Sequence, residues 1–278
     1  MTKDYSFYLE GTNGKGVLLV HGLTGAPPEM KFIGKQLHKR GFTVYAPTLA
    51  GHCLDEGALL ATCFEDWLES LRLALNNFKQ DVDEVNAAGI CVGGGLALAL
   101  AGQESAIRRV AIYSAALDYD GWNQPKWSRL ARMFHEVLVH VPAMRDRNFE
   151  EAHPFGIKSD RIRNAVMKGS EGIEGTLPHF PAKALYENYR LNRVLKKSLP
   201  SITTPTLLIH AREDDVSHPR NSYEIQKRHG GKCEVVMLED SYHMIHVDQE
   251  RHKVADFTAE FFESQGENHE DGYAATGL

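Results

Sequence analysis

The sequence predicts an α/β fold in which a mostly parallel sheet is flanked by helices and carries one inserted helical cap. Two observations predict it. Short apolar runs alternate with helical patterns along most of the chain, and this alternation is interrupted once, in the middle of the sequence. Parallel strands need crossover helices that cover both faces of the sheet, so the alternation favours a parallel arrangement. A chain of 278 residues is long enough to bury a sizeable core.

Six apolar runs supply the predicted strands. They are short and nearly continuous in apolar residues, as expected for strands that helices cover on both faces. The predicted strands are 16–20, 42–46, 84–90, 109–113, 205–210 and 234–238.

The helical pattern is clearest over 64–78, where apolar residues recur three, four and seven positions apart. Thr62, followed three positions later by Glu65, predicts a capping box at the start of this helix. Further helices are predicted over 28–40, 92–102, 219–229 and 250–262.

The alternation of strands and helices breaks after Tyr113. Segment 116–201 mixes Trp, Met and Pro with Arg and Lys, which predicts an inserted, mostly helical cap. The α/β core would then comprise 1–115 and 202–263. The polar tail 264–278 is expected to be disordered.

Composition and charge exclude several classes of protein. With 42% hydrophobic and 24% charged residues, the chain is typical of a soluble globular protein. A net charge of −6 without a long Lys/Arg run argues against nucleic-acid binding. The N-terminus lacks a secretory signal, and no run approaches the ~18 apolar residues of a membrane span. We therefore expect a cytoplasmic protein with no stable membrane insertion.

The four cysteines are expected to be reduced thiols, because they are few, widely spread and lack CxxC spacing. They are Cys53, Cys63, Cys91 and Cys233.

The segment Gly-Ile-Cys-Val-Gly-Gly-Gly at 89–95 lies between an apolar run and a small-residue helix pattern. A sharp strand-to-helix turn would strain Cys91, and glycines at 89 and 93 leave room for it. This is the form of the nucleophile elbow G-x-S-x-G with Cys in place of Ser. The helix N-terminus would favour a thiolate. A phosphate-binding turn and a merely buried cysteine are the alternatives.

A second element, 17–25, is a predicted strand that runs into His-Gly-Leu-Thr-Gly. The loop after it would expose backbone N–H groups at the carboxyl edge of the sheet. The amides of Leu23 and Val92 would then form an oxyanion hole. His21 is interpreted as a structural hydrogen-bonding residue. Residues 51–53 would form a neighbouring loop in which Cys53 packs or lines the wall.

An elbow nucleophile needs an acid and a histidine, in that chain order. Asp214 and Asp215 follow one predicted strand, and His243 follows the next. The predicted triad is Cys91, Asp214 and His243, with Asp215 as the rival acid.

Two further residues near His243 are expected to support its loop, namely His246 and Asp248. No His/Cys cluster has metal-ligand spacing, so neither a metal nor another cofactor is expected.

In combination, the motifs HGLTG, GHC, GICVGGG, AREDDVSHP and DSYHMIHVD resemble those of the α/β-hydrolase superfamily, in particular its bacterial carboxylesterase and monoacylglycerol-lipase-like branch. The resemblance covers residues 5–263 and implies an α/β-hydrolase fold with the cap as substrate lid. It also implies roles for five residues: Cys91 as nucleophile, Asp214 as acid, His243 as base, and the Leu23 and Val92 amides as oxyanion hole.

The chain departs from this branch at Cys91, where these esterases have Ser. Dienelactone hydrolases and polyhydroxyalkanoate synthases also carry GxCxG elbows, but their domain organisation or length differs. An engineered replacement of Ser would give the same sequence.

The cysteine favours activated acyl donors, because moving an acyl group from an alkyl ester to sulfur is energetically uphill. We expect an acyl hydrolase of the carboxylesterase or thioesterase type that forms a covalent thioester. Its substrate would be a small-molecule ester or thioester, with acyl-CoA and acyl-carrier protein among the candidate donors. The alternatives are an acyltransferase or cyclase that uses an amine or alcohol acceptor, and a binding protein that has lost catalysis.

Apolar and aromatic side chains of the cap are candidates for an acyl pocket, although they would equally serve as the cap's own core. They are Trp122, Trp127, Leu130, Met133, Phe134, Phe155 and Phe180.

Overall fold

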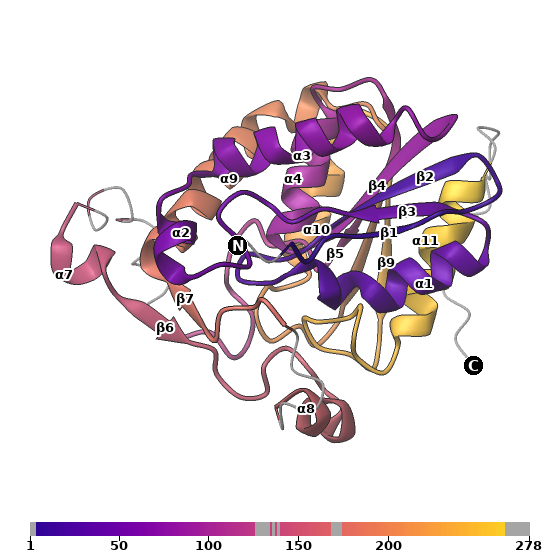
Figure 1. Ribbon diagram of the computed structural model, residues 1–278. Helices are drawn as coiled ribbons and strands as arrows, with labels where there is room; N and C mark the ends of the chain where they lie inside the picture. Colours follow the sequence, from indigo (N-terminus) through magenta and orange to yellow (C-terminus); the bar gives the residue numbers. More distant parts are fainter. Residues whose placement is uncertain (1–3, 126–133, 135–136, 138–139, 168–173, 265–278) are drawn as a thin grey trace.

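The structure is a computed structural model that describes residues 4–125, 134, 137, 140–167 and 174–264 (Figure 1). The expected disorder of the tail therefore falls, except for Ser264, outside the described residues.

A seven-stranded sheet forms the centre of the molecule, in the order β1-β3-β2-β4-β5-β8-β9. All neighbouring pairs are parallel except β1 and β3. The six predicted strands are confirmed as β2 (Lys15–Val20), β3 (Thr43–Ala46), β4 (Glu84–Ile90), β5 (Ile107–Tyr113), β8 (Thr206–Ala211) and β9 (Cys233–Leu238). The edge strand β1 (Phe7–Leu9) was not predicted, because three half-exposed residues carry no period and are strand only through their pairing with β3.

Helices cover both faces of the sheet, as the alternation predicted. Along β2, Leu18 and Val20 belong to one apolar core, whereas Val17 and Leu19 belong to the other. The first core lies under α3 (Phe64–Phe78), α4 (Val92–Ala101), α9 (Ala182–Ser198) and α10 (Arg220–Arg228). The second lies under α1 (Lys31–Lys39), which follows the 3-10 helix η1 (Pro27–Met30), and under α11 (Arg251–Glu263).

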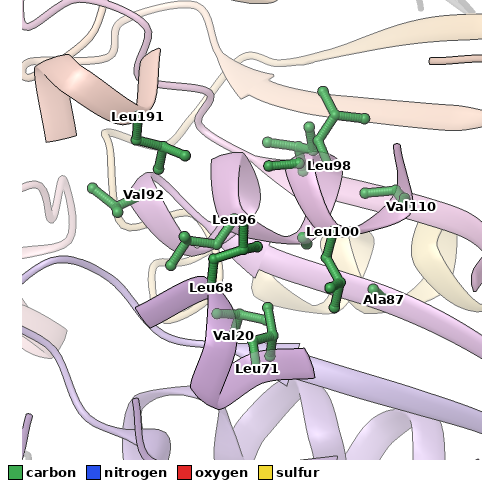
Figure 2. Close-up of a cluster of buried hydrophobic side chains, with 14 of the residues drawn as sticks. Val20, Leu68, Leu71, Ala87, Val92, Leu96, Leu98, Leu100, Val110 and Leu191 are labelled. Carbon is green, nitrogen blue, oxygen red and sulfur yellow. The ribbon is translucent and has the colours of Figure 1, made fainter. Parts of the chain in front are cut away.

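Helix α4 is the centre of the first core (Figure 2). Its leucines at 96, 98 and 100 are all fully buried, so the helix is enclosed on every side. Val92 and Leu96 face Leu191 of α9, and Leu68 and Leu71 of α3 lie below them in Figure 2. This packing fixes the axis of the helix whose first turn follows Cys91.

The predicted capping box of α3 is displaced by one residue. The N-cap is Cys63, whose backbone N–H donates to Asp66 Oδ2 at 2.9 Å. Thr62 instead accepts a hydrogen bond from Trp67 Nε1 and donates one to the Leu59 carbonyl. The hydroxyl of Thr62 is therefore used by the turn that follows α2 (Glu56–Leu60), and the helix starts one residue later.

Between β5 and β8 the chain forms more than helices. A two-stranded antiparallel ribbon, β6 (Asn148–Glu150) with β7 (His179–Pro181), lies within the predicted cap beside α2 (Figure 1). The remaining elements of this segment are α7 (Pro142–Arg145), α8 (Asp160–Met167), α9 and the 3-10 helix η2 (Leu199–Ser201). Within the described residues, no helix combines the length and the apolar character needed to cross a bilayer.

Candidate active site

Cys91 stands at a strained turn between β4 and α4. Its backbone has φ 54° and ψ −117°, a conformation that side-chain-bearing residues rarely adopt. A Cβ on Gly89 would lie 2.5 Å from the Gly93 carbonyl carbon, and one on Gly93 would lie 2.3 Å from the His21 carbonyl oxygen. Only glycine fits at these two positions, so the local geometry is that of a nucleophile elbow.

Asp214 and His243 meet at the same edge of the sheet. Asp214 follows β8, His243 follows β9, and His243 Nδ1 lies 2.9 and 3.1 Å from the two carboxylate oxygens. Cys91 lies close enough to this imidazole to raise its pKa. The structure therefore brings the three residues of the predicted triad together at one edge of the sheet.

The electrostatic surroundings of these residues favour an ionised Asp214 and a protonated His243. Burial opposes the charge on both groups, but each charge compensates the other. The pKa of Asp214 lies below its ordinary value, because the nearby His243 and His210 outweigh burial. The pKa of His243 lies well above its ordinary value, because Asp214 outweighs burial and the neighbouring Cys91 adds to the effect.

Asp214 is also held by groups outside the triad. Its Oδ1 accepts the backbone N–H of Val216 at 2.8 Å and that of Ser217 at 2.7 Å. His210 Nε2 lies 3.2 Å from Oδ2. These contacts fix the carboxylate toward His243.

The carboxylate of Asp215, the rival acid, binds the backbone of the loop that carries His243 and not the imidazole. It accepts the N–H of His243 at 3.3 Å with one oxygen and the N–H of Gly156 at 3.1 Å with the other. The side chain therefore ties the inserted segment to the loop of His243.

The two residues expected to support the His243 loop, Asp248 and His246, contribute in different ways. Asp248 accepts backbone N–H groups of Lys158, Ser159 and Tyr242 at 2.7 to 3.1 Å. His246 is fully buried, and neither ring nitrogen has a hydrogen-bond partner among the described residues. Burial and the charge of His243 lower the pKa of His246 to about 3. Its contribution to the loop is packing.

Leu23 and Val92 lie on adjacent elements at this edge. Leu23 follows the end of β2, and Val92 is the first residue of α4. The Leu23 carbonyl lies 2.8 Å from His52 Nε2, which orients the loop. His21 is buried, with Nε2 accepting the Leu49 N–H at 3.3 Å, and burial lowers its pKa to about 3. The imidazole of His21 is thus neutral and structural.

A buried carboxyl group that sequence reasoning missed lies under the same loop. Glu29, in η1, accepts the Gly22 N–H at 2.7 Å, and a Cβ on Gly25 would lie 2.2 Å from its Oε2. Burial raises the pKa of Glu29 to about 7. Glu29 holds the backbone on one side of Leu23 while His52 holds its carbonyl.

Three other supporting residues were missed as well. Ser114, at φ 46°, donates from Oγ to the His243 carbonyl at 2.6 Å. Tyr119 lies beside Cys91, and its hydroxyl accepts a hydrogen bond from Asn188 Nδ2 at 2.9 Å. No motif marks these positions, because their contacts join segments that are distant in sequence.

Cys53 lines a small pocket beside the loop of Leu23, formed by 24–25, 51–55, Leu59, Gly175 and Leu177. Burial raises the pKa of the Cys53 thiol to about 11, so it remains a neutral thiol. All four cysteines are free. Among the described residues, no group of three or more His, Cys, Asp or Glu side chains could hold a metal ion.

The cap residues considered for an acyl pocket lie in different environments. Trp122 and Phe134 are 58% and 53% exposed, and Trp122 packs edge-on against the ring of Tyr242. Phe155 is half-buried, and Phe180 packs against the first apolar core. Three others lie outside the described residues: Trp127, Leu130 and Met133.

Comparisons with known proteins agree with this fold. A family model described as serine aminopeptidase, S33, matches residues 12–250. A thermostable monoacylglycerol lipase of a Bacillus species is 29% identical over 258 residues, covering 92% of this chain and 93% of that protein. A carboxylesterase of Bacillus subtilis is 26% identical over 251 residues, covering 90% and 92%. A structure reported for the metagenome-derived lipolytic enzymes LipS and LipT superposes with a TM-score of 0.76 at 26% identity, covering 92% and 96%.

Proposed function

This chain belongs to the serine aminopeptidase S33 family of α/β-hydrolases, and we propose that it is an acyl hydrolase that cleaves small-molecule carboxylic esters or thioesters with Cys91 as nucleophile. The single observation that carries the proposal is the Asp214–His243 pair, joined at 2.9 Å, beside Cys91 at a strained elbow. The names of the similar proteins, a monoacylglycerol lipase and a carboxylesterase, support an ester bond as the target.

In the proposed acylation, His243 already holds the thiol proton of Cys91 when the sulfur attacks the acyl carbon. The carbonyl oxygen becomes an oxyanion that accepts hydrogen bonds from the Leu23 and Val92 amides. Collapse of this intermediate breaks the bond to the leaving group, which receives the proton from His243 and departs as an alcohol or thiol. The acyl group remains as a thioester on Cys91.

In the proposed deacylation, His243 takes a proton from water while the water oxygen attacks the thioester carbon. A second oxyanion forms in the same place. Its collapse breaks the carbon–sulfur bond, the sulfur regains the proton from His243, and a carboxylic acid leaves. Asp214 stays ionised throughout and stabilises the protonated imidazole.

The sulfur nucleophile narrows the substrate class. Transfer from an alkyl ester to a thiol is uphill, whereas transfer from another thioester or an aryl ester is balanced or downhill. We therefore propose activated donors, with acyl-CoA and acyl-carrier protein as physiological candidates. A cytoplasmic location would supply both. Segment 116–201 would act as the substrate lid over Cys91.

The test is intact-mass spectrometry after brief mixing with acyl thioesters and aryl esters, using wild type, Cys91→Ala and Cys91→Ser. We expect an acyl adduct on wild type that is absent from Cys91→Ala and decays in water. Decay that depends on added amine would instead identify an acyltransferase, which the reactivity of thioesters toward amines makes the second candidate. If no donor labels wild type while Cys91→Ser hydrolyses esters rapidly, the proposed nucleophile is wrong.

A further inference from the structure

A second buried imidazole contacts the acid of the proposed triad. His210, the next-to-last residue of β8, is fully buried, and its Nε2 lies 3.2 Å from Asp214 Oδ2. His243 Nδ1 lies 2.9 Å from the same oxygen. One carboxylate oxygen is therefore shared by two imidazole rings, and the proposed reaction uses only one of them.

The partners of His210 determine which ring nitrogen carries its proton. Nε2 lies 2.9 Å from the Ser217 carbonyl oxygen, which can only accept a hydrogen bond, so the proton is on Nε2. Nδ1 lies 2.7 Å from Oγ of Ser222, in the first turn of α10, and accepts the hydroxyl proton. A further proton on Nδ1 would bury a second positive charge beside His243. His210 is thus neutral, with its Nε2–H edge toward Asp214.

The other carboxylate oxygen is held independently of His210. Asp214 Oδ1 accepts the backbone N–H of Val216 at 2.8 Å and that of Ser217 at 2.7 Å. These two bonds keep the carboxylate in place, so what His210 adds is the positive end of an N–H dipole at Oδ2. We propose that His210 acts on the base through Asp214, because its Nε2–H edge draws on the charge of Oδ2 and limits how strongly the carboxylate holds the proton of His243.

This limit concerns the proton that His243 must give away. In the proposed acylation the leaving group receives its proton from His243, and an imidazolium that is paired too tightly with a carboxylate is a weak acid. Against burial, Asp214 raises the pKa of His243 well above its ordinary value. His210 moderates this effect without removing the carboxylate. The inference rests on the proposed function, since only there does His243 act as an acid.

The test follows the titration of His243 itself, by NMR of protein with isotope-labelled histidine. The parent protein is Cys91→Ala, in which no thiol titrates beside the imidazole, and no acyl donor is needed. The signals of His243 and His210 are identified by their loss in His243→Gln and His210→Leu. The other titratable groups that act on His243 are the same in all the titrated proteins: Asp214, Asp215, Glu29, Glu151 and His246.

In His210→Leu we expect the midpoint of the His243 titration to rise by about half a pH unit, or about threefold in proton affinity, because Asp214 loses a dipole at Oδ2. His210→Gln keeps an N–H donor in the place of Nε2, so its midpoint should return toward that of the parent. The control is His229→Leu. His229 Nε2 lies 3.1 Å from Thr206 Oγ, at the other end of β8, and its loss should leave the midpoint unchanged.

The signals of His210 provide a second measurement, which depends on no His210 variant that folds. In the parent they should show the neutral ring with its proton on Nε2. A proton on Nδ1 instead would overturn the inference, and so would a midpoint in folded His210→Leu that equals that of the parent. A midpoint below that of the parent would also overturn it, since His210 would then merely keep Asp214 in place.

Failure of this inference is distinguishable from failure of the proposed function. Absence of acyl labelling on wild-type Cys91 would overturn the proposed hydrolysis. It would leave the histidine signals of the Cys91→Ala protein unchanged, because no acyl group is present in that experiment.

Discussion

Two parts of the inserted segment are fastened to the core in different ways. Residues 156–159 are held by buried carboxylates, since Asp215 and Asp248 accept three backbone N–H groups from this stretch. The β6–β7 ribbon meets α2 through partly exposed polar contacts, in which Glu56 accepts from Asn148 at 3.1 Å and lies 2.6 Å from His179.

This difference indicates which part of the site is held more firmly. Buried carboxylates with several backbone donors make strong, unscreened contacts, whereas exposed pairs contribute about 0–1 kcal/mol. The stretch beside the base loop is therefore held firmly next to His243, whereas the polar contacts between the ribbon and α2 contribute little.

The largest effect is expected from Asp214→Asn. This substitution removes the charge that orients and stabilises His243. We expect kcat/KM for an aryl ester to fall by about 10³- to 10⁴-fold, because the imidazolium loses its counter-ion. Glu213→Gln, at an exposed neighbouring position, is the control. A decrease of less than tenfold for Asp214→Asn would show that another group holds His243.

Asp248→Asn tests directly how firmly the buried carboxylates hold 156–159. Part of the acceptor capacity for the N–H groups of Lys158, Ser159 and Tyr242 is lost, and each buried donor left unpaired costs about 1–3 kcal/mol. We expect the free energy of unfolding, measured in urea, to fall by about 2–4 kcal/mol. A change below 0.5 kcal/mol, against about 1–3 expected for even one unpaired donor, would contradict the comparison between the two parts of the segment.

Glu29→Gln tests the loop of Leu23 through pH. The pKa of Glu29 is raised to about 7 in the folded protein from 4.5 in the unfolded chain. The unfolded state therefore releases this proton first, and wild type loses stability as pH rises from about 4.5 through 7, by about 3 kcal/mol in total. Glutamine keeps the acceptor for Gly22 but does not titrate.

Relative to wild type, the Glu29→Gln variant should thus gain stability with increasing pH across this window. The measurement is the difference in urea unfolding free energy at pH 4, 6 and 8. A difference that stays constant over this range would mean that burial does not raise the pKa of Glu29.

The smallest effect is expected from Glu56→Gln at the ribbon. The partners of Glu56 are partly exposed, so the change in unfolding free energy should be at most about 1 kcal/mol. Susceptibility of the ribbon to limited proteolysis should increase more than global stability falls. A loss comparable to that of Asp248→Asn would show that the ribbon is as firmly held as 156–159.

Most of the sheet could be predicted, because each buried parallel strand is a short apolar run. The edge strand β1 could not, since its three residues are strand only through their partner. The N-cap of α3 lies one residue later than predicted, at Cys63, because the hydroxyl of the preceding Thr62 has a competing use in the Trp67 contact.

The sequence by itself determined the chain order of elbow, acid and histidine, and the glycines without which Cys91 could not adopt its backbone conformation. These are local properties, since strand ends and tight turns depend on neighbouring residues. Only the tertiary structure decided that Asp214 faces the imidazole while Asp215 binds backbone, and that Tyr119, Asn188, Ser114 and Glu29 surround the site. The physical reason is that a hydrogen bond is directional over about 3 Å, so it depends on how distant segments pack.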